Sequence, residues 1–472
     1  MHERRQIRVE GIVQGVGFRP FVYALATANG LGGFVLNNST GVLIELEGDR
    51  KDLERFLRDL REQAPPQAWI QKVVCDTIPA RGEERFTIAP SRDGEERRGC
   101  IAPDVAVCDE CLKELFDPAD RRHRYPFISC TNCGPRFTII GQVPYDREHT
   151  TMAAFPLCGE CEREYHDPGS RRFHAQANAC PRCGPAVRLL GPGGVEVYDA
   201  DPIAAAARLL RSGAILVLKG LGGYHLACNA LDGEAVAGLR RRKKREEKPF
   251  ALMAGDIRTV EQFCFLTGGE KALLRSPQRP VVLLRKNGRN PVAPGVAPGQ
   301  KYLGWMLPYT PLHCLLLADA GLPLVMTSGN VSEEPIACED ADALQRLGGI
   351  ADYFLAHNRQ IRQRCDDSVT RTFADREVII RRSRGYAPRP VALPRRFAQH
   401  TLACGAHLKN TFCLGKDRYA FLSHHIGDLE NYETLASFID TIEKFTALFA
   451  IRPSLVAHDL HPDYLSDRKS VV

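Results

Sequence analysis

The sequence predicts a multidomain protein of mixed α+β and α/β class. Three observations lead to this prediction: a βαββαβ order of elements before residue 90, a cysteine pattern that occurs twice between residues 108 and 183, and a change to buried strands alternating with helices near residue 201. The chain has 472 residues, enough for about three domains.

The first region alternates strands and helices. "IRVEGIV" (7–13) alternates apolar and polar residues and predicts a strand, and "PFVYALATANG" (20–30) begins with Pro and ends with Gly, as helices often do. Two strands joined by a turn at "NSTG" are predicted within 32–48, a helix follows over 50–60, and "AWIQKVVCDTI" and "RFTIA" predict the final strands. This order predicts a ferredoxin-like sandwich of roughly 90 residues.

The stretch "VQGVGFRP" (13–20) lies on the turn between the first strand and the first helix. Glycine allows backbone amides to approach a ligand closely, and a helix N-terminus adds unpaired amides with a partial positive charge. Arg19 contributes a planar set of donors suited to phosphate oxygens. These residues predict a phosphate cradle, although an ordinary tight turn with a surface arginine would have the same pattern.

Together with "GFVLN" (33–37), this turn resembles the acylphosphatase family over residues 5–90. The resemblance implies two catalytic residues. Arg19 and the loop amides would hold an acyl phosphate, and Asn37 would orient the attacking water. Without the resemblance, Asn37 would be interpreted as a turn asparagine.

The composition, with 44% apolar and 25% charged residues, describes a soluble globular protein. The net charge of +6 is weak evidence for a polyanionic partner. The first residues lack the apolar core of a signal peptide, and no run of about 18 apolar residues predicts a membrane span. Seventeen cysteines then indicate metal sites and free thiols in a reducing compartment, so we expect a cytoplasmic protein.

Eight of these cysteines form two copies of the pattern C-x2-C-x18-C-x2-C, offset by 50 residues: Cys108, Cys111, Cys130, Cys133, and Cys158, Cys161, Cys180, Cys183. The offset also maps Arg121-Arg122 onto Arg171-Arg172, so one small unit is duplicated within 100–188. Two such cysteine pairs complete a tetrahedral thiolate site with no open position, which predicts two structural Zn²⁺ sites.

Each zinc contributes on the order of 10–16 kcal/mol to folding, which a segment with few apolar residues needs. We expect each metal to be bound within one half, and interleaved pairing of the two halves is the alternative. His123, His166 and His174 break the repeat, so we expect surface histidines there.

The region 200–390 has an α/β pattern. Seven of the nine residues from Arg240 to Lys248 are basic, and the apolar segment "PFALM" follows them directly, which predicts an anion site at the mouth of a sheet. A second apolar strand ends in the small polar residues 328–330, as is typical of ligand loops in α/β folds. A solvated helix face is the usual alternative for the basic run. No P-loop pattern is present.

"KGLGGYHL", Lys243-x-Arg245 and "TSGN" resemble the YrdC family, which includes the threonylcarbamoyl-adenylate synthases. The resemblance implies that the region binds ATP, with Mg²⁺, and forms a carbamoyl-type adenylate. It also implies that Lys243, Arg245, Ser328 and Asn330 line the nucleotide pocket. "CDDSV" (365–369) and "RRSRGYAP" (381–388) also resemble family segments, without an assigned role.

The last region, 398–472, resembles the start of a domain similar to the transfer-RNA threonylcarbamoyltransferases, which have an actin-like ATPase fold. The order of all four regions resembles the carbamoyltransferases of [NiFe]-hydrogenase maturation. That resemblance implies a relay. Carbamoyl phosphate is hydrolysed, the carbamate joins AMP, and the carbamoyl group passes to the C-terminal cysteine of the partner HypE, where it becomes a cyanide ligand.

An actin-like domain needs more residues than remain, and the final "DRKSVV" fits the family poorly. We therefore expect the natural gene to continue past Ser466 and the transfer step to be lost in this truncated chain. Two other functions stay open. One is a threonylcarbamoyl-adenylate synthase for transfer-RNA modification, which would lack the first two regions. The other is a zinc-dependent nucleic-acid-binding protein, with double-stranded RNA as a partner of the YrdC-like region.

Overall fold

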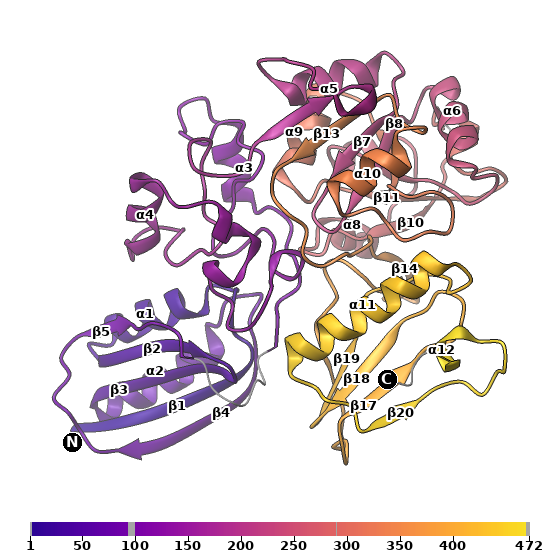
Figure 1. Ribbon diagram of the computed structural model, residues 1–472. Helices are drawn as coiled ribbons and strands as arrows, with labels where there is room; N and C mark the ends of the chain where they lie inside the picture. Colours follow the sequence, from indigo (N-terminus) through magenta and orange to yellow (C-terminus); the bar gives the residue numbers. More distant parts are fainter. Residues whose placement is uncertain (1, 93–99, 289, 469–472) are drawn as a thin grey trace.

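The first region forms the predicted ferredoxin-like sandwich (Figure 1). Its elements are β1 (His2–Ile12), α1 (Phe18–Ala28), β2 (Gly32–Asn38), β3 (Gly41–Asp49), α2 (Arg50–Glu62), β4 (Trp69–Ile78) and β5 (Phe86–Ile88). The strand order is β4-β1-β3-β2-β5, with β5 parallel to β2. Helix α1 begins two residues before the predicted start, because Gly17 takes the left-handed conformation (φ 75°) that ends the preceding turn.

The structure is a computed structural model that describes residues 2–92, 100–288 and 290–468. Within these residues, no helix is long and apolar enough to cross a membrane. Four of the six residues of the terminal "DRKSVV" segment, 469–472, lie outside the described residues.

The second region, which we call the finger module (residues 100–186), contains little regular structure. Its elements are α3 (Asp109–Phe116), α4 (Gly159–His166) and the short 3-10 turns η1 (Phe137–Ile139), η2 (Arg147–His149) and η3 (Thr151–Ala154). The duplication is visible in the fold, because each half starts a helix directly after its first cysteine, Cys108 or Cys158.

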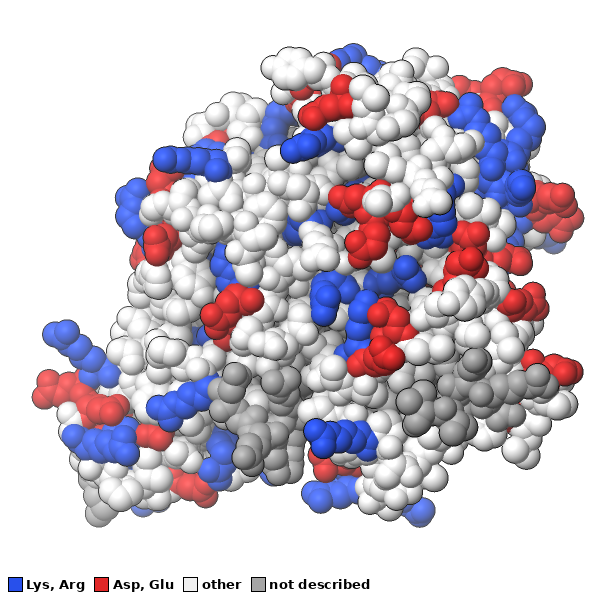
Figure 2. Space-filling view, viewed as in Figure 1, with Lys and Arg blue, Asp and Glu red and all other residues white. Residues whose placement is uncertain are grey.

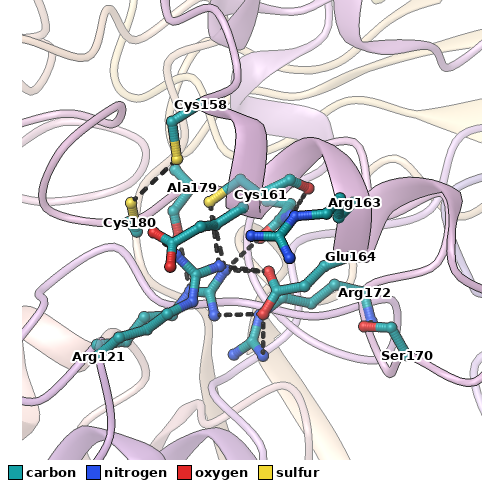
Figure 3. A network of polar contacts seen from close by, with 12 residues as sticks. Arg121, Cys158, Cys161, Arg163, Glu164, Ser170, Arg172, Ala179 and Cys180 are labelled. Atoms are coloured by element: carbon teal, nitrogen blue, oxygen red, sulfur yellow. Dashed lines mark hydrogen bonds and ion pairs between the residues drawn. The ribbon is translucent and has the colours of Figure 1, made fainter.

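The two halves of the finger module are joined by reciprocal arginine–glutamate contacts. Figure 3 shows the contacts around Glu164. Arg122 of the first half donates to Glu164 Oε1 of the second (2.9 Å), to the Ala179 carbonyl (2.9 Å) and to Cys161 Sγ (3.5 Å). The equivalent Arg172 of the second half pairs with Glu114 of the first. Each half therefore supplies the counter-charge that the other half requires.

Burial alone would raise the pKa of the Glu164 carboxyl, but Arg122 and its neighbouring arginines lower it to about 2. Glu164 is therefore ionised throughout the neutral range, and Arg122, whose side chain is 1% exposed, depends on this carboxylate for its charge partner. The carboxylate is offset by 50 residues from Glu114, like the cysteines and the arginines.

The third region forms a mixed ten-stranded sheet of order β15-β14-β10-β11-β9-β12-β8-β7-β13-β6. Its strands are β6 (Val187–Leu190), β7 (Leu216–Lys219), β8 (Tyr224–Asn229), β9 (Ala251–Met253), β10 (Val281–Arg285), β11 (Tyr302–Met306), β12 (Leu324–Ser328), β13 (Tyr353–His357), β14 (Val369–Phe373) and β15 (Arg376–Arg381). The sequence placed residues 187–190 at the end of the cysteine region and in a linker, but β6 pairs with β13 as the edge strand of this sheet.

The helices of this region are α5 (Pro202–Arg211), α6 (Gly233–Lys243), α7 (Ile257–Glu261), α8 (Gly268–Arg275), α9 (Pro311–Ala320) and α10 (Asp340–Leu347), with 3-10 turns η4 (Pro192–Gly194) and η5 (Pro294–Val296). Alternate residues of β7 belong to two apolar cores: Leu216 and Leu218 to the core that contains α5 and α9, and Val217 to the core that contains α6 and α10. The sheet is therefore covered on both faces, as in α/β folds.

The last region is a smaller sheet of order β16-β19-β18-β17-β20 beside one long helix, α11 (yellow in Figure 1). Its elements are β16 (Val391–Ala392), β17 (Thr401–Cys404), β18 (Phe412–Lys416), β19 (Tyr419–Leu422), α11 (Tyr432–Phe449), β20 (Leu455–Ala457) and α12 (Leu465–Arg468). Phe438 and Phe445 of α11 pack edge-on against Phe412 of β18.

The finger module contacts the other three regions. Tyr23 of α1 packs against Phe173, Arg124 forms ion pairs with Asp319 at the end of α9, and Phe137 packs against Phe445 of α11. Two of the candidate sites described below lie where these contacts join the regions.

The reciprocal contacts make a testable prediction. Replacing Arg122 with Met leaves the Glu164 carboxylate without its buried partner, and breaking a buried ion pair from one side costs about 3–5 kcal/mol. We expect amides between residues 161 and 179 to exchange hydrogen more than about 100-fold faster in Arg122→Met. The matched control is Arg163→Met, because Arg163 is exposed on the same helix and donates only to the Gly159 carbonyl at 3.4 Å. Equal protection in the two variants would contradict the structural role of Arg122.

Candidate functional sites

The eight cysteines converge as two sets of four, each within one half of the finger module. In the first set, the Sγ atoms of Cys130 and Cys108 lie 3.7 Å apart and those of Cys130 and Cys133 lie 3.8 Å apart. With Zn–S bonds of about 2.3 Å, a tetrahedral site has S–S edges of about 3.8 Å. Both sets therefore fit a four-thiolate zinc ion, with the pairing within each half rather than the interleaved one.

The glycine-rich turn ahead of α1 is formed by backbone that only glycine adopts easily. Gly15 and Gly17 have φ of 69° and 75°. A side chain on Gly15 would also come within 3.0 Å of the Tyr145 ring and 3.1 Å of the Arg136 side chain. The glycines are therefore required partly because the finger module lies directly against the turn.

Arg19 and Asn37 meet in the pocket behind this turn. With its amide oxygen turned toward Arg19, Asn37 accepts hydrogen bonds from Arg19 Nε and Nη2, both at 3.2 Å. Arg19 Nη2 also pairs with Asp146 Oδ1 of the finger module (2.8 Å). Arg19 and Asn37 are both at least nine-tenths buried. The guanidinium is therefore held in one place, in the pocket that Gly15 and Gly17 also line.

The finger module forms the opposite wall of this pocket, which the sequence did not predict. Arg136, Tyr145, His174 and Gln176 line it together with Arg19. Arg136 donates from Nε to the Gly15 carbonyl and from Nη2 to the Thr131 carbonyl (2.9 Å), which joins the turn to the first cysteine set.

The prediction of three surface histidines was wrong for His174. His123 and His166 are exposed, but His174 is half-buried in the pocket with Arg19. Burial, together with the charge of Arg19, lowers the pKa of its imidazole to about 4. A neutral imidazole therefore faces the cradle at physiological pH. The duplication gave no sign of a role for His174, because the equivalent position in the first half is Arg124 and not a histidine.

The second pocket is lined by all four residues predicted for a nucleotide site. Lys243, at the end of α6, is 1% exposed and donates from Nζ to the Ser328 carbonyl (2.8 Å) and to Asn330 Oδ1 (2.6 Å). Ser328 Oγ donates to the same Asn330 oxygen (2.8 Å). Burial, with the nearby charge of Arg245, lowers the pKa of Lys243 to about 7.

The last region contributes the far wall of this second pocket through Lys409, His425 and Asp428. The pocket therefore lies between the third and fourth regions, and neither region forms it alone. The sequence did not suggest these three residues, because they lie on loops that carry no recognisable ligand pattern.

The segments "CDDSV" and "RRSRGYAP", which had no predicted role, meet at an ion pair. Arg384 Nε donates to Asp367 Oδ1 (2.7 Å), and Asp367 Oδ2 lies 2.9 Å from His225 Nε2. Burial would raise the pKa of the Asp367 carboxyl, but Arg384 and His225 hold it far below its usual range. This chain of contacts holds His225 and Asp367 at the floor of the second pocket.

Four family models match the chain in succession. Their descriptions are Acylphosphatase (residues 5–88), HypF finger (residues 107–140 and 157–190), Telomere recombination, which covers the Sua5, YciO and YrdC proteins (residues 208–383), and HypF Kae1-like domain (residues 396–470).

Two curated relatives match almost the whole of this chain. The chain is 50% identical to Carbamoyltransferase HypF2 of Cupriavidus necator and 47% identical to Carbamoyltransferase HypF of Synechocystis, in each case over 98% of this chain and 60% of the relative. It superposes on a crystal structure of full-length HypF in the phosphate- and nucleotide-bound form with a TM-score of 0.96 at 50% identity, and on HypF of T. kodakarensis with 0.91 at 43% identity. These matches cover 99% of this chain and 61% and 60% of those chains.

The chain thus spans about 60% of the length of the relatives that it matches. Over that length, the four domains, their order and their fold agree, and the chain belongs to the HypF carbamoyltransferase family.

Proposed function

We propose that this chain carries out the first two steps of a carbamoyl relay whose last step passes the carbamoyl group to a partner protein. The acylphosphatase-like domain hydrolyses carbamoyl phosphate, and the YrdC-like domain joins the carbamate to AMP. The observation that carries the proposal is that one chain holds an arginine–asparagine cradle and a separate lysine-lined pocket, in the fold of a HypF protein solved with phosphate and nucleotide.

In the first step, water attacks carbamoyl phosphate and releases carbamate and inorganic phosphate. Arg19 and the amides of the glycine turn would neutralise the phosphate oxygens, since phosphoryl chemistry depends mainly on positioning and charge. Asn37, which Arg19 holds in place, would direct the attacking water. The buried walls from the finger module would limit access of bulk water to the product.

In the second step, a carbamate oxygen attacks the α-phosphorus of ATP and pyrophosphate leaves. Lys243, Arg245 and the Ser328–Asn330 turn would bind the phosphates. Mg²⁺, held mainly by the phosphates, would neutralise part of their charge. The carboxylates that line the same pocket, and would lie near such an ion, are Glu333, Glu334, Asp366, Asp367 and Asp428.

The acceptor that we propose is the C-terminal cysteine of HypE. Its thiolate would attack the carbamoyl carbon, and AMP would leave. The adenylate would form next to the fourth domain. This domain supplies Lys409, His425 and Asp428 to the second pocket.

A nucleic-acid-binding function has less support. Arg240 of the basic run donates to the Gly295 and Arg245 carbonyls, Arg242 pairs with Asp352, and Lys243 is buried. These cations are used within the fold rather than presented as a phosphate-binding stripe. On the face shown in Figure 2, acidic and basic side chains are interspersed. One group of Lys and Arg lies near the centre, and another lies at the upper right, where Figure 1 places α6, with acidic side chains beside it.

The cradle makes the first prediction for this function. Arg19→Ala should lower carbamoyl-phosphate-dependent formation of AMP from ATP at least ~100-fold, because a charged donor to the reacting phosphate is lost. A carbamate-containing solution should partly restore AMP formation. Arg8→Ala is the control, since Arg8 lies on the exposed side of the same sheet and pairs with Asp76. AMP formation at the wild-type rate in Arg19→Ala would exclude the cradle as the site of the first step.

The nucleotide pocket makes a prediction about pH. The pKa of Lys243, about 7, lies below its ordinary value, so the charged form that binds phosphate is lost as the pH rises through 7. We expect the affinity for ATP to fall between pH 7 and pH 9, by up to about tenfold per unit, with proton uptake on binding in calorimetry. Lys243→Met should bind weakly at every pH, and the exposed neighbour variant Lys244→Met should keep the wild-type slope. A pH-independent affinity in the wild type would contradict this role.

The cysteine sets predict two bound zinc ions per chain, which a reducing compartment such as the cytoplasm would preserve. Cys130→Ser and Cys180→Ser should each lose one zinc in elemental analysis. Cys75→Ser, which changes an exposed cysteine outside both sets, should retain two. Two zinc ions in Cys130→Ser would show that the first set is not a zinc site.

A further inference from the structure

A narrow cavity, separate from the two pockets described above, lies between the finger module and the third region. The finger module supplies Phe127 and Pro135, and the third region supplies Lys219, Tyr309 and Arg359. The cavity has room for a group of only a few heavy atoms, so it is too small for a nucleotide.

Arg359 is the unusual member of this lining. It is 6% exposed, and its guanidinium lies 5.1 Å from the Phe127 ring centroid. Within the described part of the chain, this guanidinium makes no hydrogen bond and no ion pair. The carboxylate that acts on it through space is Asp104. Asp104 Oδ1 accepts from the Arg136 backbone N–H and the Thr138 hydroxyl, and it makes no ion pair with Arg359.

The other cation of the cavity is compensated. Lys219 Nζ pairs with Asp340 and donates to the His357 carbonyl (2.9 Å). The cavity therefore contains one positive charge, on Arg359, that no described acceptor or carboxylate contacts. A buried charge without a partner is strongly unfavourable, and a single contact with an aromatic face offsets only part of that cost.

A small anion would remove this imbalance. A guanidinium presents parallel N–H donors that match the two oxygens of a carboxylate-like group. The planar shape of the guanidinium and the narrow cavity both favour a planar oxyanion with one carbon centre, such as carbamate, bicarbonate or formate, over phosphate.

The location of the cavity gives such an anion a role. On one side, the Pro135 carbonyl accepts from Tyr145 Oη (3.1 Å), and Tyr145 lines the pocket of Arg19. On the other side, Tyr309 Oη lies 3.4 Å from His225 Nε2, and His225 lines the nucleotide-type pocket. One layer of side chains therefore separates the cavity from each of the two candidate sites.

We propose that the Arg359 cavity is a binding site for a small planar oxyanion, between the site that would produce carbamate and the site that would consume it. The identity of the natural anion rests on the proposed function, whereas the existence of the site does not. Arg359 is a binding residue here, and no bond is formed or broken in the cavity.

Binding of formate to the whole chain tests whether the site exists. Formate replaces chloride at constant ionic strength, and the thermal unfolding midpoint and the calorimetric binding isotherm are recorded. We expect the wild type to be stabilised by formate through one site that Arg359→Met lacks. Since Met removes an uncompensated buried charge, Arg359→Met should unfold no earlier than the wild type without formate. Arg371→Met is the matched control, because Arg371 also lies over an aromatic ring, that of Tyr302 (5.7 Å). Equal formate responses in the wild type and Arg359→Met would overturn the site.

The ratio of AMP formed to phosphate released from carbamoyl phosphate tests the role of the site. Arg359→Met should release phosphate at the wild-type rate but lower this ratio about tenfold, the effect of one lost charge-assisted contact. An unchanged ratio would overturn the role of the cavity on the route between the sites. If the wild type forms no AMP at all, the proposed function fails, and the formate experiment still decides whether the site exists.

Discussion

The reciprocal arginine–glutamate pairing inside the finger module is the interaction on which the rest of the structure depends. The module has two short α-helices, three 3-10 turns and no β-strand. It therefore cannot rely on a large apolar core of its own. Arg122 and Arg172 each bring a charge from one half to a carboxylate of the other, and these same arginines approach the backbone that carries the cysteines. The halves are thus coupled to each other and to their metal-ligand sets.

This coupling matters beyond the module because the other domains are built against it. Phe137 belongs to the apolar core that contains both the ferredoxin-like sandwich and α11, and Phe127 belongs to the core on one face of the ten-stranded sheet. A shift of one half relative to the other would therefore displace the walls of both the Arg19 pocket and the Arg359 cavity.

The Arg19 pocket and the Lys243 pocket share one physical feature, because each is completed by a second domain. A cradle on an isolated ferredoxin-like sandwich would open to solvent, and here Tyr145 and Gln176 cover it. The lysine-lined pocket would likewise lack one wall without the loops around Lys409 and His425. Enclosure suits an unstable intermediate such as carbamate, and it strengthens each charge interaction because water is excluded.

The sequence by itself determined the four kinds of domain, the ferredoxin-like element order, the two cysteine sets and the residues Arg19, Asn37, Lys243, Arg245, Ser328 and Asn330 that the structure gathers in two pockets. These features are local, because each depends on spacing, on turn chemistry or on a short run of residues. Only the tertiary structure decided which cysteines meet, that β6 joins the large sheet and that His174 faces Arg19. It also decided that Arg359 is buried with no hydrogen-bond or ion-pair partner among the described residues. Apart from the meeting of the cysteines, those outcomes depend on contacts between residues from different domains, often more than 100 positions apart, as for Arg19 and Asp146. The spacing of apolar and polar residues along the chain does not predict such contacts, because they arise from the packing of whole domains.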